Sequence, residues 1–178
     1  MKKPIPPDTV LIPPEAECVY QGALFDFYQW QQELFDGRRQ TFDMVRRPDI
    51  VATIGIVDGK IVTVVDDQPH RGVRVGLPGG RVDPGDVSLL AAAQREMREE
   101  TGYDVQLIEQ FALYHESAPQ SVKHVFLAEI IGGEEHAQEG EILEVVWQTF
   151  DEIAEHEKAG RMRAPWVFDV IGKLENRS

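Results

Sequence analysis

The chain of 178 residues is long enough for one domain with an elaborated end, and 42% of its residues are hydrophobic, which suffices for an ordinary core. A formal net charge of −13 argues against nucleic acids and anionic membranes as partners, because both would repel the protein. Cys18 is the only cysteine, which excludes a disulfide framework within the chain, and neither a membrane-spanning segment nor a signal peptide is expected. We therefore expect a protein of the reducing cytoplasm.

The N-terminal part of the sequence predicts extended structure followed by antiparallel strands. Residues 1–15 are rich in proline and are expected to be extended. Mixed aromatic and polar residues at positions 17–34 indicate β structure, and Asp36-Gly37 is a hairpin-turn signal before a returning strand at residues 38–46. Pro48 ends that strand. We interpret residues 1–48 as an N-terminal β extension.

From residue 49 onward, strands and helices alternate. Two apolar, β-branched runs flank Asp58-Gly59 and predict a second hairpin at residues 50–57 and 60–65. Further strands are expected before Leu77-Pro78 and at residues 104–114, 122–131 and 142–148, with a loop at residues 115–121 and helices at residues 89–101, 150–159 and 166–174. This mixture predicts an α/β (α+β) fold with a mixed sheet over residues 49–178.

Three carboxylates crowd one face of the helix between Ser88 and Gly102. Glu96, Glu99 and Glu100 lie within about one turn of one another. Each repelling pair costs roughly a few tenths of a kcal/mol even on an exposed helix, so we expect a cation among them. Hard oxygen ligands suit Mg²⁺, Mn²⁺ or Ca²⁺, although a Glu-rich helix face by itself is usually only a solvated surface.

The rest of this helix is expected to serve packing and positioning. One stripe should face the core, and it consists of Leu90, Ala93, Met97 and Thr101. Ala92 stands one turn before Glu96 and is expected to leave room for a ligand. Arg95 is the cation nearest Glu99 around the helix and is expected to hold that side chain in place.

Residues 79–103 resemble the signature of the Nudix hydrolases, which reads Gly, five residues, Glu, seven residues and then Arg-Glu-apolar-x-Glu-Glu-x-Gly-apolar. The helical half is intact and consists of Arg95, Glu96, Glu99, Glu100, Gly102 and Tyr103. The loop half begins at Gly80 and departs at two points. Asp86 replaces the first glutamate, and eight residues instead of seven separate it from Arg95. In the family that first glutamate is less critical than the helix acids, so activity is still expected.

The resemblance implies an α/β/α sandwich and hydrolysis of a nucleoside diphosphate linked to a group X. It implies a small nucleotide as the substrate and Mg²⁺ as the cofactor, with Mn²⁺ as an alternative. The implied metal ligands are the backbone carbonyl of Gly79 and the carboxylates of Glu96, Glu100 and Glu99, the last as a ligand or its close support. Carboxylate-bound divalent ions neutralise charge on a phosphoanhydride and lower the pKa of a bound water.

A general base commonly comes from a later loop in this family. Here that loop spans residues 134–144, and Glu141 and Glu139 are the best candidates, with Glu144 third. For any one of these residues, a solvated acidic loop is the alternative interpretation.

The N-terminal extension narrows the choice among possible nucleotide substrates. ADP-ribose and ADP-sugar pyrophosphatases of the family carry N-terminal strands that pair two subunits, and residues 17–47 resemble that element. The resemblance implies a homodimer and makes ADP-ribose the leading substrate, with GDP-sugars and dinucleoside polyphosphates still open. Candidates for stacking the base and holding phosphate or ribose are Trp30, Phe42, Arg46 and Arg71. Pro119, sixteen residues beyond the signature, is also similar to a proline of that subfamily, whereas residues 68–71 and 75–80 depart from its usual pattern.

Two other classes of function remain open at this point. A Nudix-fold protein that binds a ligand or regulates a partner without turnover is compatible with Asp86 and the altered loop. A structural metal-binding domain has less support, because the sequence contains no EF-hand loop pattern and no zinc-type Cys/His spacing. Retention of all three helix carboxylates favours an enzyme.

Overall fold

The computed structural model describes residues 12–68, 70–117 and 120–177. These residues form two compact units. The first contains the described residues up to position 50 together with Tyr114–Lys123, and the second contains Val51–Leu113 and the chain from His124 onward. Pro119, noted above for its similarity to a subfamily proline, lies outside the described residues.

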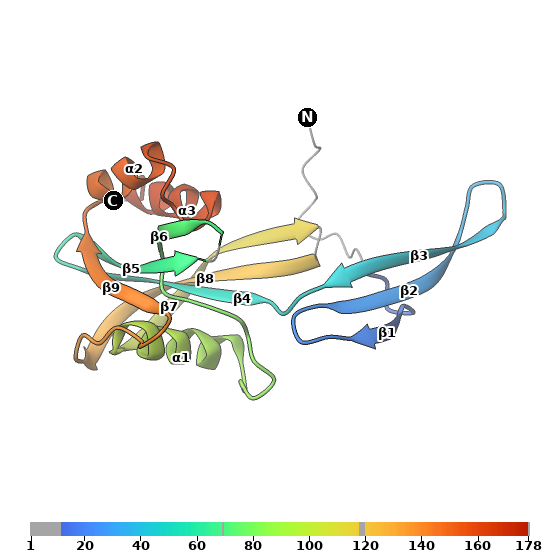
Figure 1. Cartoon of the computed structure of the whole chain (residues 1–178), viewed down its shortest axis with the longest axis horizontal. Coiled ribbons are helices and arrows are strands. Elements are labelled where there is room, and N and C mark those ends of the chain that lie inside the picture. Colours follow the sequence, from blue (N-terminus) through green and yellow to red (C-terminus); the bar gives the residue numbers. More distant parts are fainter. Residues whose placement is uncertain (1–11, 69, 118–119, 178) are drawn as a thin grey trace. The chain divides into compact units, whose positions relative to one another are not determined.

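Three antiparallel strands form most of the first unit (Figure 1). They are β1 (Glu17–Gln21), β2 (Asp26–Glu33) and β3 (Arg39–Arg46). The predicted turn between β2 and β3 is confirmed. Gly37 adopts a φ of 81°, and its N–H donates to the carbonyl of Leu34 at 3.0 Å. Glycine reaches this left-handed conformation without a steric penalty, which explains the Asp36-Gly37 signal.

The side chains of this unit bury little apolar surface. Trp30 and Phe42 lie opposite each other on β2 and β3, with ring centroids 6.1 Å apart. The large apolar side chains that remain exposed are Val19, Tyr20, Leu24, Phe25, Phe27, Phe35 and Phe42. A thin sheet with so much exposed apolar surface lacks the packing that usually stabilises an isolated hairpin.

The sheet of the second unit is built around β5 (Lys60–Gln68). β9 (Ile142–Gln148) pairs along one edge of β5, and β4 (Ile50–Val57) and β6 (Gly72–Gly76) pair with successive parts of the other edge, all antiparallel. β8 (Gln120–Gly133) neighbours β4, and β7 (Tyr103–Ser117) pairs with β8. The predicted Asp58-Gly59 turn is confirmed, because both residues have the positive φ values of a type I′ hairpin, 50° and 73°.

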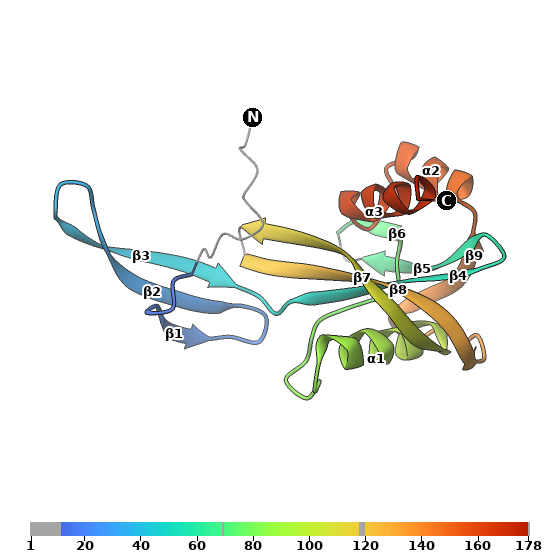
Figure 2. The same cartoon turned by 180° about the vertical axis from the view of Figure 1, so that it is seen from behind.

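Helices cover both faces of this sheet (Figures 1 and 2). α1 (Leu89–Thr101) lies on one face, and α2 (Phe150–Lys158) and α3 (Pro165–Glu175) lie on the other. The predicted α+β class with an α/β/α sandwich is therefore confirmed. None of the helices among the described residues combines the length and the apolar character needed to cross a bilayer.

Three of the four residues in the predicted core-facing stripe of α1 are buried, namely Ala93, Met97 and Thr101. Leu90 is 51% exposed, whereas Ala92 and Ala93 are completely buried beside Val51 and Phe126. The prediction of the stripe was therefore wrong only at Leu90, and the space expected at Ala92 for a ligand is filled by the core instead. Burial extends along the same face of the helix to Glu100, so one of the three carboxylates belongs to the inner side.

The predicted loop at residues 115–121 was also wrong, because β7 continues to Ser117 and β8 begins at Gln120. Gln120 pairs with Arg46 of β3, and the N–H of Val122 donates to the Asp49 carboxylate at 3.0 Å. These contacts lie within the first unit and come from residues distant in sequence, so the local pattern could not predict them.

Candidate active site

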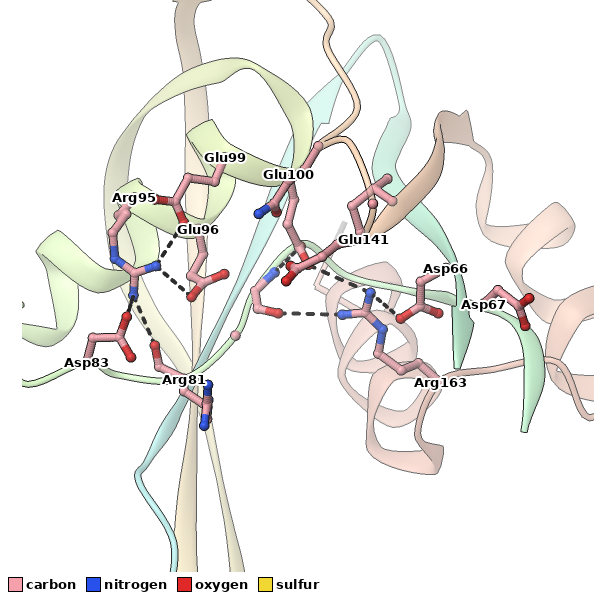
Figure 3. Close-up of a pocket in the computed structure, with 15 residues that line it drawn as sticks. Asp66, Asp67, Arg81, Asp83, Arg95, Glu96, Glu99, Glu100, Glu141 and Arg163 are labelled. Atoms are coloured by element: carbon pink, nitrogen blue, oxygen red, sulfur yellow. Dashed lines mark hydrogen bonds and ion pairs between the residues drawn. The ribbon is translucent and has the colours of Figure 1, made fainter. Parts of the chain in front are cut away.

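A cavity of about 580 Å³ opens in the second unit beside the C-terminal half of α1 (Figure 3). Its walls come from β5, the loop before α1, α1 itself, the loop before β9 and the connection between α2 and α3. Seven acidic and three basic residues are among those that line it: Asp66, Asp67, Asp83, Glu96, Glu99, Glu100, Glu141, Arg81, Arg95 and Arg163. The volume is within the range of small-molecule sites, and the excess of acids suits cations.

Both ends of α1 are fixed as the sequence predicts. The hydroxyl of Ser88 accepts the N–H of Ala91 at 3.1 Å, and Gly102 ends the helix with a φ of 79°. Gly102 is also pressed against the chain that follows β8, where an added Cβ would lie 2.1 Å from the carbonyl oxygen of Glu134. A turn and a backbone contact together therefore set where the acidic part of α1 lies.

Arg95 is the cation that the crowded carboxylates attract in this structure. Its guanidinium donates to Glu96 Oε1 at 2.8 Å and to Glu99 Oε2 at 2.9 Å, and also to the carbonyl of Arg81 at 3.0 Å. The expectation that Arg95 holds Glu99 is confirmed. Hydrogen bonds to carboxylates, with that of Asp86 first, raise the pKa of Arg95 above its ordinary value.

Asp86 anchors Arg95 from the other side. Its two oxygens accept from Nε and Nη2 of Arg95 at 3.0 and 2.9 Å, and its side chain is only 7% exposed. These bonds, followed by the N–H of Asp83, lower the pKa of the Asp86 carboxyl. The loop beside it faces solvent at Val87, whose side chain is 92% exposed. The shorter acid and the longer loop therefore still supply a bidentate partner for Arg95.

The glycine loop before α1 fits where a side chain would not. A Cβ on Gly79 would lie 2.2 Å from the carbonyl oxygen of Val51, and one on Gly80 would lie 2.6 Å from the carboxylate of Glu96. The carbonyl of Gly80 accepts the N–H of Val51 at 2.9 Å. Among the residues that the structure describes, the carbonyl of Gly79 accepts only a long contact of 3.5 Å from Nη1 of Arg163, which leaves its lone pairs largely available there.

Glu100 is the buried member of the acidic group. Glu100 is 6% exposed, and its Oε2 accepts the N–H of Gly79 at 2.7 Å. Burial raises the pKa of Glu100 to about 7, although the nearby Arg163 and the Gly79 N–H both favour the ionised form. A bound divalent cation would stabilise the charged carboxylate against this desolvation.

Glu96 and Glu99 differ from each other in exposure. Burial raises the pKa of Glu96, and its ion pair with Arg95 acts in the opposite direction. The side chain of Glu99 is 47% exposed and reaches the cavity from its outer edge. Two of the three carboxylates, those of Glu100 and Glu96, are therefore largely buried, and that of Glu99 is solvated.

Sequence reasoning missed Asp66 and Arg163. Asp66 on β5 is buried, and its Oδ2 lies 2.9 Å from Nη2 of Arg163, which follows α2 in the chain. No local motif marks either residue. Gly76 makes room for Arg163, because a Cβ there would lie 3.1 Å from three of its side-chain atoms, but only the folded structure reveals this contact.

The remaining predicted site residues fall in different places. Glu141 lines the cavity, whereas Glu139 is exposed and is not among the lining residues. Arg71 is exposed in the turn between β5 and β6 and does not line the cavity either. The other three substrate candidates, Trp30, Phe42 and Arg46, belong to the first unit, and their role remains a prediction.

The carboxylate and carbonyl oxygens of the cavity are the kind of ligand that a hard divalent cation binds. Glu100 Oε1 and Glu96 Oε2 accept no hydrogen bond from the described residues, and the Gly79 carbonyl accepts only the long contact from Arg163 among them. Among the residues that the structure describes, no three His, Cys, Asp or Glu side chains already converge as a metal site. Enclosing an ion therefore requires side chains such as Glu96, now paired with Arg95, to rotate.

A family model described as the NUDIX domain matches residues 46–169. The chain belongs to the Nudix family. It is 29% identical over 143 residues to the ADP-ribose pyrophosphatase of Bacillus subtilis (strain 168), a match that covers 76% of this chain and 77% of that protein. It is 25% identical over 155 residues to the methanol dehydrogenase activator of Bacillus methanolicus, with 83% of each covered. A crystal structure described as an ADP compounds hydrolase superposes with a TM-score of 0.67 at 20% identity, covering 92% of this chain and 91% of that chain.

These comparisons confirm the family that the signature predicted, and its α+β fold. The predicted enzyme class, a Nudix pyrophosphohydrolase, is confirmed as well. Nudix enzymes act on small nucleotide substrates and generally use a divalent metal ion. The cavity described above contains the helix acids of the matched signature.

Proposed function

We propose that this Nudix enzyme is a Mg²⁺-dependent hydrolase of nucleoside diphosphates linked to X, with ADP-ribose as the first candidate substrate. The reaction would break the pyrophosphate bond and release a nucleoside monophosphate. The observation that carries the proposal is the buried Glu100 carboxylate, held by the N–H of Gly79, near the end of the helix that carries the intact helical half of the family signature. Mn²⁺ is expected to replace Mg²⁺ because both accept hard oxygen ligands.

The residues of the cavity would have separate roles, as metal ligands or in positioning those ligands. Glu96, Glu99, Glu100 and the Gly79 carbonyl would hold the ion, which neutralises phosphate charge and lowers the pKa of a bound water. Arg95 would keep Glu96 and Glu99 in place between metal-binding events, since it contacts both. In phosphoryl chemistry most catalysis is positioning and electrostatic stabilisation, so few further groups are required.

Glu141 is our preferred general base. It lines the cavity, whereas Glu139, two residues earlier in the same loop, does not. Glu141→Gln should lower kcat by at least ~10²-fold, in the range expected for the loss of general-base catalysis. Glu139→Gln is the matched comparison, and a larger loss in that variant would transfer the role to Glu139.

ADP-ribose has the support of one relative. The relative from Bacillus subtilis is named an ADP-ribose pyrophosphatase, and the match covers about three quarters of both chains. Base stacking and phosphate binding by Trp30, Phe42, Arg46 and Arg71 remain part of the proposal. GDP-sugars and dinucleoside polyphosphates are the competing substrates.

The test is a substrate panel. The purified chain is incubated with ADP-ribose, GDP-mannose or a diadenosine polyphosphate, each with Mg²⁺ or with EDTA, and nucleoside monophosphate is measured. We expect release from ADP-ribose that EDTA abolishes and that Glu96→Gln or Glu100→Gln lowers by at least ~10²-fold. Glu175→Gln, at an exposed carboxylate at the end of α3, is the control that should retain activity. Full activity in either active-site variant would defeat the metal assignment.

A ligand-binding or regulatory protein with weak catalysis is the second candidate. One relative is named an activator of another enzyme, which favours it. The altered signature loop also suggested it, but Asp86 still anchors Arg95, so the loop no longer argues against catalysis. No monophosphate release from the whole panel would favour this second candidate.

We also propose a homodimer that forms through residues 17–47, within an N-terminal extension of residues 1–48 that precedes the Nudix domain of residues 49–178. Exposed apolar side chains on β1, β2 and the adjoining turns support this assignment, because pairing with a second copy would cover them. The cytoplasm is the proposed compartment, since Cys18 is a free, exposed thiol.

A further inference from the structure

Arg163 is built firmly into the wall of the acidic cavity. It lies between α2 and α3, and its N–H donates to the carbonyl of Val75 on β6 at 2.7 Å. The N–H of Val75 in turn donates to the carbonyl of Arg161 at 2.9 Å. Gly76 leaves the space in which the side chain of Arg163 lies. Backbone bonds and packing therefore bring this guanidinium to the cavity from outside the signature.

One nitrogen of Arg163 faces two buried carboxylates (Figure 3). Nη2 lies 2.9 Å from Asp66 Oδ2 and 3.8 Å from Glu100 Oε1. The side chains of Asp66 and Glu100 are 5% and 8% exposed. At 2.9 Å the first contact is a close ion pair, whereas the second, at 3.8 Å, is a long one and is beyond hydrogen-bond distance. Arg163 is thus held by Asp66 in preference to Glu100.

Oε1 of Glu100 accepts no hydrogen bond from the described residues, and a metal ion would bind Glu100 through this oxygen. Its other oxygen, Oε2, already accepts the N–H of Gly79. A movement of Nη2 by roughly 1 Å toward Oε1 would shorten this long ion pair to hydrogen-bond distance and would occupy that oxygen. In a site shielded from water such a pair is strong, because attraction between charges grows as the effective dielectric constant falls.

We propose that Asp66 and Arg163 are a positioning pair, in which Asp66 keeps the guanidinium away from Glu100 Oε1 so that this oxygen stays available to a divalent cation. The inference rests on the proposed metal-dependent function. Neither residue needs to touch the ion. Asp66 offsets the charge of Arg163 and fixes its direction, and the guanidinium left without Asp66 becomes a competitor for the metal site.

The test measures binding of Mn²⁺ alone to the full chain by electron paramagnetic resonance at pH 8, without substrate. Asp66→Asn removes the partner of Arg163. Asp67→Asn is the matched control, because Asp67 is the next residue, lines the same cavity and is exposed. Both variants remove one negative charge from the cavity, so a difference between them isolates the freed guanidinium.

We expect Asp66→Asn to raise the Mn²⁺ dissociation constant by at least ~10-fold. The freed Arg163 would pair with Glu100, and this buried ion pair would have to break before the metal binds. Asp67→Asn should raise it by no more than about fivefold, the scale of an exposed charge. Adding Arg163→Gln to Asp66→Asn removes the competitor and should return binding to the level of Asp67→Asn. A merely structural role for Asp66 predicts no rescue by a second substitution.

Two results would overturn the inference while leaving the metal site intact: equal binding in the two single variants, or no rescue in the double variant. If Asp66→Asn fails to fold by circular dichroism, Arg163→Gln alone decides. It should bind Mn²⁺ at least as tightly as the parent chain, and weaker binding would reject the competitor role. If the parent chain itself binds no Mn²⁺, the proposed function fails, and the inference fails with it.

Discussion

Replacing Glu100 by glutamine should stabilise the metal-free protein while removing most of its turnover. Burial raises the pKa of Glu100 from 4.5 to about 7. At about 1.4 kcal/mol per pKa unit, this shift corresponds to a penalty of about 3 kcal/mol for the ionised carboxylate in the folded chain. Glutamine has nearly the same shape, carries no charge and keeps an oxygen for the N–H of Gly79, so it avoids that penalty.

The pH dependence has a definite sign. Below pH 4.5, Glu100 is protonated in both the folded and the unfolded chain, so its ionisation does not affect stability. Between pH 4.5 and about 7 the unfolded chain releases the proton first, so the stability of the parent protein falls as pH rises. The stabilisation by Glu100→Gln should therefore be below about 1 kcal/mol at pH 5 and about 3 kcal/mol at pH 8.

Thermal unfolding in EDTA at pH 5 and pH 8 measures this difference. For a chain of this size, the midpoint of Glu100→Gln at pH 8 should lie roughly 5–10 °C above that of the parent protein. Glu99→Gln is the control, because the side chain of Glu99 is 47% exposed and its loss should matter by no more than about 1 kcal/mol. Equal midpoints at pH 8, or the same offset at both pH values, would refute the argument that burial destabilises ionised Glu100.

Three further outcomes test other parts of the molecule. Gly80→Ala should lower turnover in steady-state kinetics by at least roughly tenfold, because its Cβ would lie 2.6 Å from the Glu96 carboxylate, and unchanged rates would contradict this contact. Asp86→Asn should release Arg95 and lower the free energy of unfolding by on the order of 1–3 kcal/mol in a urea titration, and an unshifted midpoint would count against the anchor. Light scattering at micromolar concentration should give a dimer that Phe27→Asp dissociates, and a strict monomer would reject the proposed interface.

The sequence predicts this structure best where a signal is local. Ser88 and Gly102 set the limits of α1 because a cap and a left-handed turn depend on adjacent residues. The hairpin turn at Asp58-Gly59 follows from the same kind of chemistry. The signature identified the helix acids, but it did not reveal that Glu100 is buried, because that depends on which face of the helix meets the sheet.

The features that sequence reasoning missed depend on distant parts of the chain. Asp66 and Arg163 come from β5 and from the segment after α2, and only the folded sheet brings them together. The predicted core-facing stripe of α1 was correct at Ala93, Met97 and Thr101 but wrongly included Leu90. Packing against Val51 and Phe126 buries Ala92 in the first half of the helix, which the spacing of apolar residues did not predict.

The contact of Gly102 with the chain after β8 gives the two halves of the signature different tolerance to mutation. Asparagine often replaces glycine in left-handed turns, yet at this position any side chain would meet the Glu134 carbonyl oxygen at 2.1 Å. Gly85, in the loop half, has no atom within 4 Å of where a Cβ would be. A side chain therefore fits sterically at Gly85 in the loop half, whereas the position that ends the helix admits glycine alone.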